Sequence, residues 1–405
     1  MAETRLPRGA QVHLGTLDGD LRADRDVRIT SDGTVTVTGS VRFDGPAEVV
    51  GSLVCTRFRS ADGTVLIQGN LTVREDVEAH DGVLDIAGAI KAQRVDVDRR
   101  LRIGGVAEAE KFDVGGVLEG EQSMKARSVS VGGRFHLAGK LEAENVEAGG
   151  AVTLAEVSID TLEVGGTVRL GGGEVRRSIE VGGRFRSDRP ISFGSMEVGG
   201  LAEFEETAKG GAIEVGGLLS AAKDLGFDSL EIGGVGRIGG NATGNRAKIG
   251  GKFDVRGSLT LAQGLGVGGA ISVREVLTAE RLELGGSLET RRAILSDLCE
   301  VGGNVTTQEG LKAARIRLQR KSRARGPLVG QTIEIERSAH VDDLFGGEIT
   351  LEERAEARRI FGARVRLRDG ASADEILYTD SVEVDARARV RSPPRKVDTL
   401  PPFPL

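Results

Sequence analysis

An aliphatic residue followed by Gly-Gly recurs through the central part of the chain and organises its hydrophobic and polar positions. From Val114 to Val301 successive copies are 16 to 18 residues apart, most of them 17. An apolar residue also lies two positions before the aliphatic residue, as Ile179 lies before Val181, and this period of two is typical of a strand. A fixed step of this length is typical of a solenoid, in which each repeat forms one coil.

Two more apolar columns accompany each repeat. One lies four residues after the aliphatic residue and includes Phe135 and Phe185, and the other lies ten residues after it and includes Leu141, Leu277 and Ile294. Three inward-facing segments per repeat describe a three-sided coil of parallel strands. The sequence therefore predicts an all-β fold, a parallel β-helix or β-solenoid with about 17 residues per coil.

The Gly-Gly pairs are predicted to be structural corners between strands. Because glycine tolerates positive φ, we expect strained backbone there. The first glycines of these pairs are Gly115, Gly132, Gly165, Gly182, Gly199, Gly216, Gly233, Gly250, Gly285 and Gly302.

Before the Gly-Gly series, the same alternation continues with corners such as Asp62-Gly63. Asp-Gly is also the usual hairpin turn, so antiparallel hairpins are an alternative. We favour coils because Ile86 and Ile103 are again 17 residues apart. After residue 311 the Gly-Gly pairs stop, but strand-like pairs such as Ile349 and Leu351 persist.

These patterns predict one continuous solenoid over residues 11–391, preceded by an N-terminal arm at 1–10. Its sub-regions are 11–105, 106–311 with Gly-Gly corners, and 312–391 without them. Residues 392–405 carry five prolines, so we expect a disordered or extended tail.

The composition agrees with a solenoid. Aromatic residues make up only 3% of 405 residues, and there is no Trp, whereas a globular core of this size uses more aromatic side chains. The net charge of −6 is mild and spread along the chain, so we do not expect a nucleic-acid partner. Two cysteines are too few for a disulfide framework, and Cys299 falls in an inward column, so it is predicted to be buried. The chain shows no secretion signal and no apolar stretch of membrane-spanning length, which favours a cytoplasmic location.

A column of glutamates lies one residue before the aliphatic residue of successive repeats. Its members are Glu147, Glu163, Glu180, Glu197, Glu214 and Glu231. Stacked about 5 Å apart, neighbouring carboxylates would repel by roughly 1 kcal/mol in water. The column is a candidate lateral stripe for cations or a basic partner surface. The alternative is a solvated face neutralised by nearby arginines such as Arg176, Arg177 and Arg184.

A basic run extends from Arg315 to Arg325. It is a candidate contact for an anionic membrane surface or for another protein, as is the Pro-rich tail. The alternative is that the glutamates of the following strands, Glu334, Glu336 and Glu348, neutralise it.

The sequence contains no recognisable group of catalytic, cofactor-binding or metal-binding residues. The four histidines are scattered, and every Gly-Gly pair opens another strand rather than the helix that a phosphate-binding loop requires. A filled three-sided prism also offers no cleft for catalysis. We therefore expect a protein that is not an enzyme and that holds no cofactor.

The units Ser178–Phe185 and Ser229–Val235, together with the Pro-rich tail, resemble those of the bactofilins. The resemblance implies a right-handed three-sided β-helix that polymerises without nucleotide as a cytoskeletal element, and this chain would be an unusually long member.

The first functional hypothesis is accordingly a polymer-forming structural scaffold whose partner is a second copy of itself. The second is a non-polymerising solenoid that acts as a binding or display scaffold, for example at the cell envelope. An acyltransferase of the left-handed β-helix type is disfavoured, because those enzymes use 18-residue coils built from hexapeptides. For the first hypothesis, the candidate end-to-end interface comprises Val12, Leu14, Leu17, Ile376, Leu377, Tyr378, Val382 and Val384.

Overall fold

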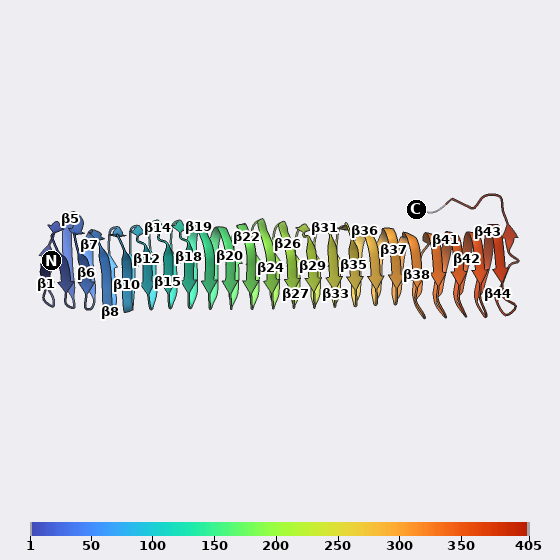
Figure 1. The fold of residues 1–405 in the computed structure, drawn as a ribbon, viewed down its shortest axis with the longest axis horizontal. Helices are drawn as coiled ribbons and strands as arrows, with labels where there is room; N and C mark the ends of the chain where they lie inside the picture. The colour runs from blue at the N-terminus through green and yellow to red at the C-terminus, as the bar shows by residue number, and fades with distance from the viewer. Residues whose placement is uncertain (1, 403–405) are drawn as a thin grey trace. The chain divides into compact units, whose positions relative to one another are not determined.

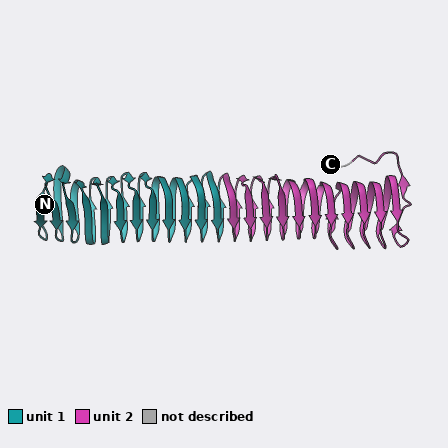
Figure 2. Ribbon diagram, viewed as in Figure 1, with its two compact units in different colours: residues 1–205 teal, residues 206–405 magenta. Residues whose placement is uncertain are grey.

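The computed structural model describes residues 2–402, which form parallel β-strands without a helix. The chain makes about 23 coils of roughly 17 residues, so the predicted all-β parallel β-solenoid is confirmed (Figure 1). The coils fall into two compact units, residues 1–205 and 206–405 (Figure 2).

The strands of unit 1 are β1 (Glu3–Leu6), β2 (Gln11–His13), β3 (Thr16–Leu17), β4 (Asp20–Ala23), β5 (Val27–Val37), β6 (Ser40–Phe43), β7 (Ala47–Cys55), β8 (Arg57–Ile67), β9 (Leu71–Val73), β10 (Asp76–Ile86), β11 (Ile90–Lys91), β12 (Arg94–Val97), β13 (Arg100–Ile103), β14 (Ala107–Glu108), β15 (Lys111–Val114), β16 (Val117–Gly120), β17 (Met124–Lys125), β18 (Ser128–Val131), β19 (Arg134–Ala148), β20 (Ala151–Val164), β21 (Thr167–Leu170), β22 (Gly173–Val181), β23 (Arg184–Ser187), β24 (Ile191–Val198) and β25 (Leu201–Phe204). Those of unit 2 are β26 (Ala208–Val215), β27 (Leu218–Ala221), β28 (Leu225–Gly226), β29 (Ser229–Ile232), β30 (Val235–Ile238), β31 (Ala242–Gly244), β32 (Arg246–Ile249), β33 (Lys252–Val255), β34 (Leu259–Leu261), β35 (Gly264–Val267), β36 (Ala270–Leu284), β37 (Ser287–Val301), β38 (Asn304–Leu318), β39 (Arg323–Arg325), β40 (Leu328–Ile335), β41 (His340–Leu351), β42 (Glu356–Leu367), β43 (Ser372–Val384), β44 (Arg389–Val390) and β45 (Arg395–Lys396).

Each coil contributes three strand segments, and each segment pairs in parallel with its counterpart in the next coil. We call the ladder that ends at Gly-Gly face A, the ladder after Gly-Gly face B, and the third ladder face C. Their register is illustrated by the pairs Ile179↔Met196 on face A, Val168↔Phe185 on face B and Val175↔Phe193 on face C. Since the register joins residues about one repeat apart, like residues stack on like.

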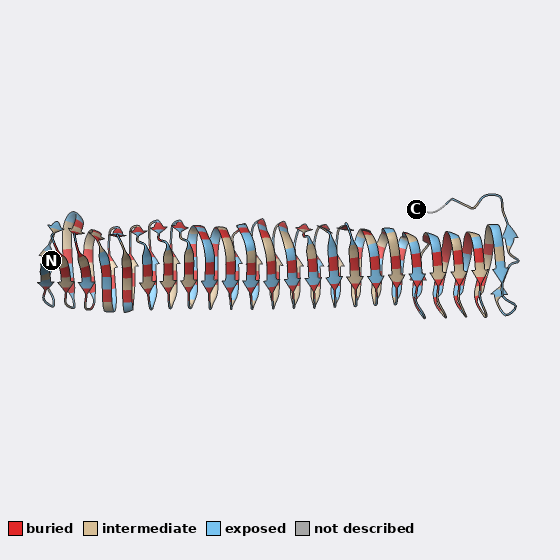
Figure 3. Cartoon of the chain, viewed as in Figure 1, coloured by how far each residue is buried: buried red, intermediate tan, exposed pale blue. Residues whose placement is uncertain are grey.

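The stacked inward residues form the core of each unit. Buried and exposed positions alternate along the strands, as the period of two predicts (Figure 3). In unit 1 the ring of Phe204 lies 5.7 Å from that of Phe185 and 6.0 Å from that of Phe193, centroid to centroid. Each such fully buried side chain contributes about 1.5–3 kcal/mol through the apolar surface that it removes from water.

The Gly-Gly corners differ from the prediction in their physical reason. Their first glycines do not have positive φ. Instead, a Cβ at the first glycines of unit 1 would press on the backbone of the preceding coil, for example 2.8 Å from the Gly182 carbonyl oxygen at Gly199 and 2.7 Å from the Gly165 carbonyl oxygen at Gly182. Glycine is needed in these unit 1 corners because successive coils stack without room for a side chain, whereas in unit 2 a Cβ on Gly285 would have its nearest neighbour at 3.6 Å.

Positive φ occurs instead at the Asp corners of unit 1. Asp62 has φ 48°, Gly63 has φ 107° and Asp81 has φ 47°. Asp accepts this conformation more readily than most residues because its short polar side chain bonds locally. The corners lie within β8 and β10, and these two strands pair in parallel on both sides of them, so each corner joins two sides of one coil and the hairpin alternative is wrong.

The N-terminal arm predicted at residues 1–10 contains a strand of the solenoid. Residues 3–6 form β1, which pairs in parallel with β4, so Glu3 lies beside Asp20. Leu6 is buried, with 8% of its surface exposed. The alternation of Thr4 and Leu6 is too short to identify a strand from sequence, but β4 supplies the edge on which it pairs.

One inward position was also predicted wrongly. Ile294 is 37% exposed, while Ala293 is fully buried. The cause is a shift of register between β36 and β37, which pairs Leu277 with Ala293, 16 residues on. The one-residue shift turns Ile294 to the outer surface.

Candidate interaction surfaces

The predicted glutamate column is a true ladder within unit 1. The register stacks Glu147 on Glu163, Glu163 on Glu180 and Glu180 on Glu197, all on face A and all exposed. We call these four residues the acidic ladder. Among the described residues of the chain, none of the four has an ion-pair partner.

The arginines expected to neutralise this column form no ion pair with it among the described residues. Arg176 and Arg177 both contact Asp160, and Arg184 forms no ion pair within residues 2–402. In unit 2 the column comprises Glu214 and Glu231, which stack on each other. The carboxylate of Glu231 is neutralised by Lys248, 2.9 Å away. The unit 1 ladder therefore keeps its negative charge at the surface.

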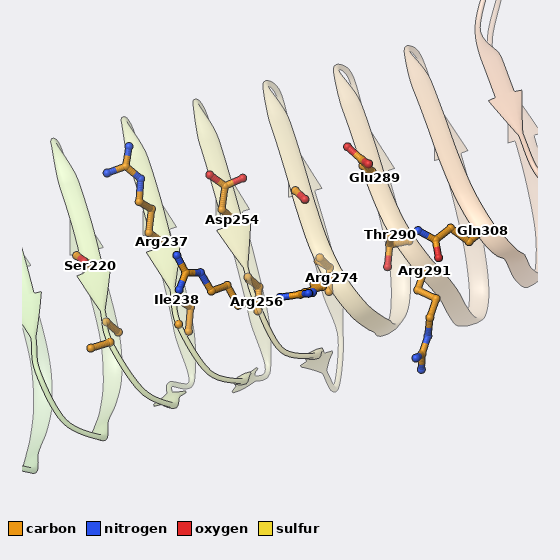
Figure 4. A pocket seen from close by; sticks show the side chains of 16 residues that line it. Ser220, Arg237, Ile238, Asp254, Arg256, Arg274, Glu289, Thr290, Arg291 and Gln308 are labelled. Carbon is orange, nitrogen blue, oxygen red and sulfur yellow. The ribbon is translucent and has the colours of Figure 1, made fainter.

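A groove in unit 2 runs along face B and its corner, with a volume of about 690 Å³ (Figure 4). Arg237, Arg256 and Arg274 line it, and all three are exposed. Within the described residues none of the three guanidinium groups has an ion-pair partner. We call this cavity the arginine groove.

The side chains of the groove form two rows. Arg256 and Arg274 lie along the corner with Arg274 directed toward Arg256, while Arg291 points away (Figure 4) and pairs with Glu275 at 2.9 Å. The other row lies on face B and holds Arg237 together with the carboxylates of Asp254 and Glu289. The corner row is thus the more positive of the two.

The predicted basic run is partly neutralised. Arg315 lies 2.7 Å from Asp297, and Arg317 lies 3.0 Å from Glu334. The other two glutamates expected to neutralise the run form no ion pair with it. Glu348 pairs with Arg364, and Glu336 forms no ion pair in the described chain. The remaining cations of the run also lack an ion pair among residues 2–402; they are Arg320, Lys321, Arg323 and Arg325.

At the N-terminal end of unit 1, the first coil leaves one edge of each strand without a partner in the described chain. The strands β1, β2 and β3 pair only with β4 and β5. Val12, Leu14 and Leu17 are half-buried, whereas Ile29 and Val37, which pair with Val12 and Leu17 one coil further in, are 0% and 2% exposed. This end of the core is open to solvent.

At the C-terminal end of unit 2, the last coil consists of the end of β43 on face A, β44 on face B and β45 on face C, and none of the three has a partner strand on its outer side in the described chain. Val384 is 40% exposed, although its register partner Leu367 is fully buried, and Val382 is half-buried. On faces B and C the outermost strands are β44 and β45, which pair only with β43 among the described residues.

The candidate end residues before Val382 are consequently misplaced. Leu377 pairs with Arg395 and Tyr378 with Lys396, so β45 covers both, and Ile376 is a core residue with 1% exposure. The predicted interface at this end reduces to Val382 and Val384.

The tail predicted to be disordered or extended packs against the solenoid over the part that the structure describes. After β45 it runs back beside the last coils of unit 2 (Figure 1), and Leu400 packs on a row of outward apolar side chains. That row, which we call the apolar strip, comprises Val329, Phe345, Phe361 and Leu377. Residues 403–405 of the predicted tail lie outside the described residues.

The strip was missed from sequence, although a signal existed. Adjacent apolar residues such as Leu344 and Phe345 cannot both face inward in a strand. Leu344 is fully buried in the core, so Phe345 points outward and stacks on Phe361 with ring centroids 4.7 Å apart. Outward apolar rings need a cover, and Leu400 supplies part of it.

A buried carboxylate lies next to the strip. Asp343 is 6% exposed and accepts hydrogen bonds from Arg359 and Arg358, with Nε distances of 2.9 and 3.1 Å. Burial opposes ionisation of Asp343, but the hydrogen bonds and charges of the two guanidinium groups outweigh it and lower the pKa of Asp343 below its ordinary 3.8. Arg359 also lies over the Phe361 ring, 5.8 Å from its centroid.

Both cysteines are buried, which confirms the prediction for Cys299. Desolvation raises the pKa of Cys55 and of Cys299 to about 12, so both stay protonated thiols. Within residues 2–402 no group of three or more His, Cys, Asp or Glu side chains is arranged to hold a metal ion.

The arginine groove was also missed from sequence. Arg256, Arg274 and Arg291 each lie seven residues after the aliphatic residue of successive Gly-Gly repeats, so the repeat itself carried the signal. The repeat does not show which of the three would find acidic partners.

These features define the class of the protein as a parallel β-solenoid with charged columns on its outer faces. Comparison of the chain with known protein families, with curated proteins and with solved structures finds no match. In the described part of the chain there is no helix long and apolar enough to cross a membrane.

Proposed function

We propose that the protein is a structural scaffold whose copies polymerise end to end without nucleotide, as a bactofilin-like cytoskeletal element. The observation that carries this proposal is the pair of open ends, the first coil of unit 1 and face A of the last coil of unit 2. Unpaired strand edges and an exposed core cross-section are a template for a further strand, which natural proteins usually cover.

The two ends are complementary in chemistry. The last strand on face A presents the inward residues Val382 and Val384 beside the outward Glu383, and the first presents Thr4 and Leu6 beside the outward Arg5. Stacking one copy on the next at the same register would set Val384 on Leu6 and Glu383 beside Arg5.

This stacking would continue an existing ion-pair column. Glu383 already lies 2.7 Å from Arg366 of the preceding coil, and Arg5 lies 3.1 Å from Asp24 of the following one. Because the two ends are different surfaces, each added copy leaves a new end open, and such heterologous contacts extend without closing unless the rotation between copies forms a ring.

A non-polymerising scaffold that displays a binding surface is the second candidate. The observation that favours it is the C-terminal segment, since the outermost strands on faces B and C are the two-residue strands β44 and β45, which offer a further copy little backbone to pair with. The proposed location is the cytoplasm, and the unpaired cations between Arg320 and Arg325 are the proposed contact for an anionic membrane surface.

Negative-stain microscopy of the purified protein, with Val12→Lys combined with Val384→Lys, tests the polymer. We expect filaments from the natural sequence without added nucleotide and folded, unextended particles from the double variant, because a charge would have to be buried at each joint. Val106→Lys is the control, since Val106 is an exposed apolar residue away from both ends, with 45% of its surface exposed. Absence of filaments from the natural sequence under all solution conditions would favour the second candidate.

A further inference from the structure

Unit 2 holds cations that repel one another. Arg256 and Arg274 each follow a member of the register pair Val255↔Val273, so they are one coil apart, which is about 4.8 Å along the stack. Two guanidinium groups at this spacing repel by roughly 1 kcal/mol in water, and by more where solvent is displaced. No carboxylate of the described chain pairs with either group, so the corner row has the charge of an anion-binding surface.

Unit 1 holds the opposite arrangement. The four carboxylates of the acidic ladder repeat at the same coil spacing and have no cation partner in the described chain. The outward residues beside them on face A are uncharged: Asn145, Thr161, Ser178 and Ser195.

We propose that the acidic ladder of one copy docks in the arginine groove of a second copy. This lateral contact rests on the proposed function, since it would join filaments or staggered copies side by side. Both columns advance by one coil, so consecutive carboxylates meet consecutive guanidinium groups without accumulating mismatch. Guanidinium–carboxylate pairs are also the strongest of the charge-assisted hydrogen bonds that these side chains form.

The neighbouring rows fit the same placement. Of the two directions in which the ladder can lie against Arg256 and Arg274, the proposed one places its uncharged column toward the row that contains Asp254 and Glu289. Neutral polar side chains can hydrogen-bond to those carboxylates, whereas a continuous polyanion such as nucleic acid would be repelled by them. The groove thus fits a ligand with one column of acidic side chains and a neighbouring column of uncharged polar side chains.

The contact is heterologous because the ladder and the groove are different surfaces of the same chain. Each copy bound through its ladder still offers its groove to another, so association continues laterally unless the arrangement forms a closed ring. The interface consists of exposed charges, so it should weaken steeply with ionic strength.

Charge reversal on each side, followed by mixing, tests the proposal. The groove variant carries Arg256→Glu and Arg274→Glu, and the ladder variant carries Glu163→Arg and Glu180→Arg. Sedimentation velocity at low ionic strength should show that each variant alone associates at least about tenfold more weakly than the natural sequence. An equimolar mixture should recover association, because reversed ladders meet reversed grooves.

The control variant is Lys209→Glu with Arg246→Glu. Both residues are exposed cations of unit 2 without an ion pair in the described chain, and the change in net charge equals that of the groove variant. Lateral association of this variant should match that of the natural sequence. Thermal unfolding of every variant separates a loss of contact from a loss of fold.

Three results would overturn the proposal: unchanged association of both variants, a mixture that fails to recover it, or equal weakening by the control. A groove variant that loses binding of inorganic polyphosphate while lateral association persists would identify a polyanion as the occupant instead. Failure of the polymer proposal is distinguished by carrying out the mixing experiment in the Val12→Lys, Val384→Lys background. Recovery there supports the lateral contact even if no filament ever forms.

Discussion

The second glycine of each Gly-Gly pair should matter more than the first in unit 2, and Gly285 and Gly286 allow a matched comparison. A Cβ on Gly286 would overlap the carbonyl oxygen of Gly269 and lie 2.9 Å from that of Gly268. A Cβ on Gly285 would lie 3.6 Å from its nearest neighbour, the Val267 carbonyl oxygen, which is ordinary contact. Neither glycine has positive φ, so conformational strain does not distinguish the two sites.

The magnitude follows from what the added methyl group displaces. The Gly269 carbonyl accepts a hydrogen bond from the Ser287 amide at 2.9 Å, and Gly286→Ala would push these groups apart. Forcing a methyl group into a packed site costs about 1–3 kcal/mol, and the weakened hydrogen bond adds about 0.5–1.5 kcal/mol. Gly285→Ala should be neutral or stabilising by about 0.4–1 kcal/mol, because alanine restricts the unfolded chain.

Thermal unfolding followed by circular dichroism in the strand region measures the difference. For a cooperative unit of about 200 residues, a change of 1 kcal/mol shifts Tm by roughly 2–4 °C, so Gly286→Ala should lower Tm by roughly 3–18 °C. Gly285→Ala should leave Tm unchanged or slightly higher. Equal Tm values for the two variants would refute the account in which stacking of coils, rather than backbone conformation, selects these glycines.

Three other predictions concern unit 2 or the buried thiols. Because the pKa of Asp343 is lowered below 3.8, the stability that its ionised form contributes is present above about pH 4 and is lost as pH falls through the lowered value. Asp343→Asn should therefore lower the free energy of unfolding by about 1–3 kcal/mol at pH 7 in urea titrations, with a gap that narrows in acid; a gap independent of pH would contradict the assignment. Cys55 and Cys299 should resist a thiol-specific reagent in the native protein and react once it is unfolded in urea, because both are buried with pKa raised to about 12. Leu400→Asp should uncover the apolar strip and increase binding of a hydrophobic dye, whereas Thr399→Asp, at an exposed neighbour, should not; equal dye binding would mean that Leu400 does not cover the strip.

Much of the fold could be predicted because its signals are local. The alternation that places Ile179 and Val181 inward is a property of any strand, and a repeat of constant length makes each residue stack on its counterpart in the next coil. The same reasoning placed Cys299 in the core and the acidic ladder on an outer face. The reason given for the Gly-Gly corners was wrong, because crowding rather than positive φ excludes a side chain at the first glycines of unit 1, and at Gly285 neither does.

The features that the sequence did not predict depend on contacts between residues that are not at equivalent positions of the repeat. A shift of register turned Ile294 outward, and no pattern in its own segment reports the length of the preceding corner. The packing of Leu400 decided that a proline-rich segment covers the apolar strip, and β45 decided that Leu377 is not at an open edge. Ion-pair geometry likewise decided that Arg291 is neutralised while Arg256 and Arg274 are not.

The sequence by itself determined the strand period, the coil length and the columns of like residues, since these follow from backbone geometry and from steric stacking within a repeat. Only the tertiary structure decided which columns keep their charge and which ends stay open, because burial and ion pairing depend on every neighbour that packs around a residue.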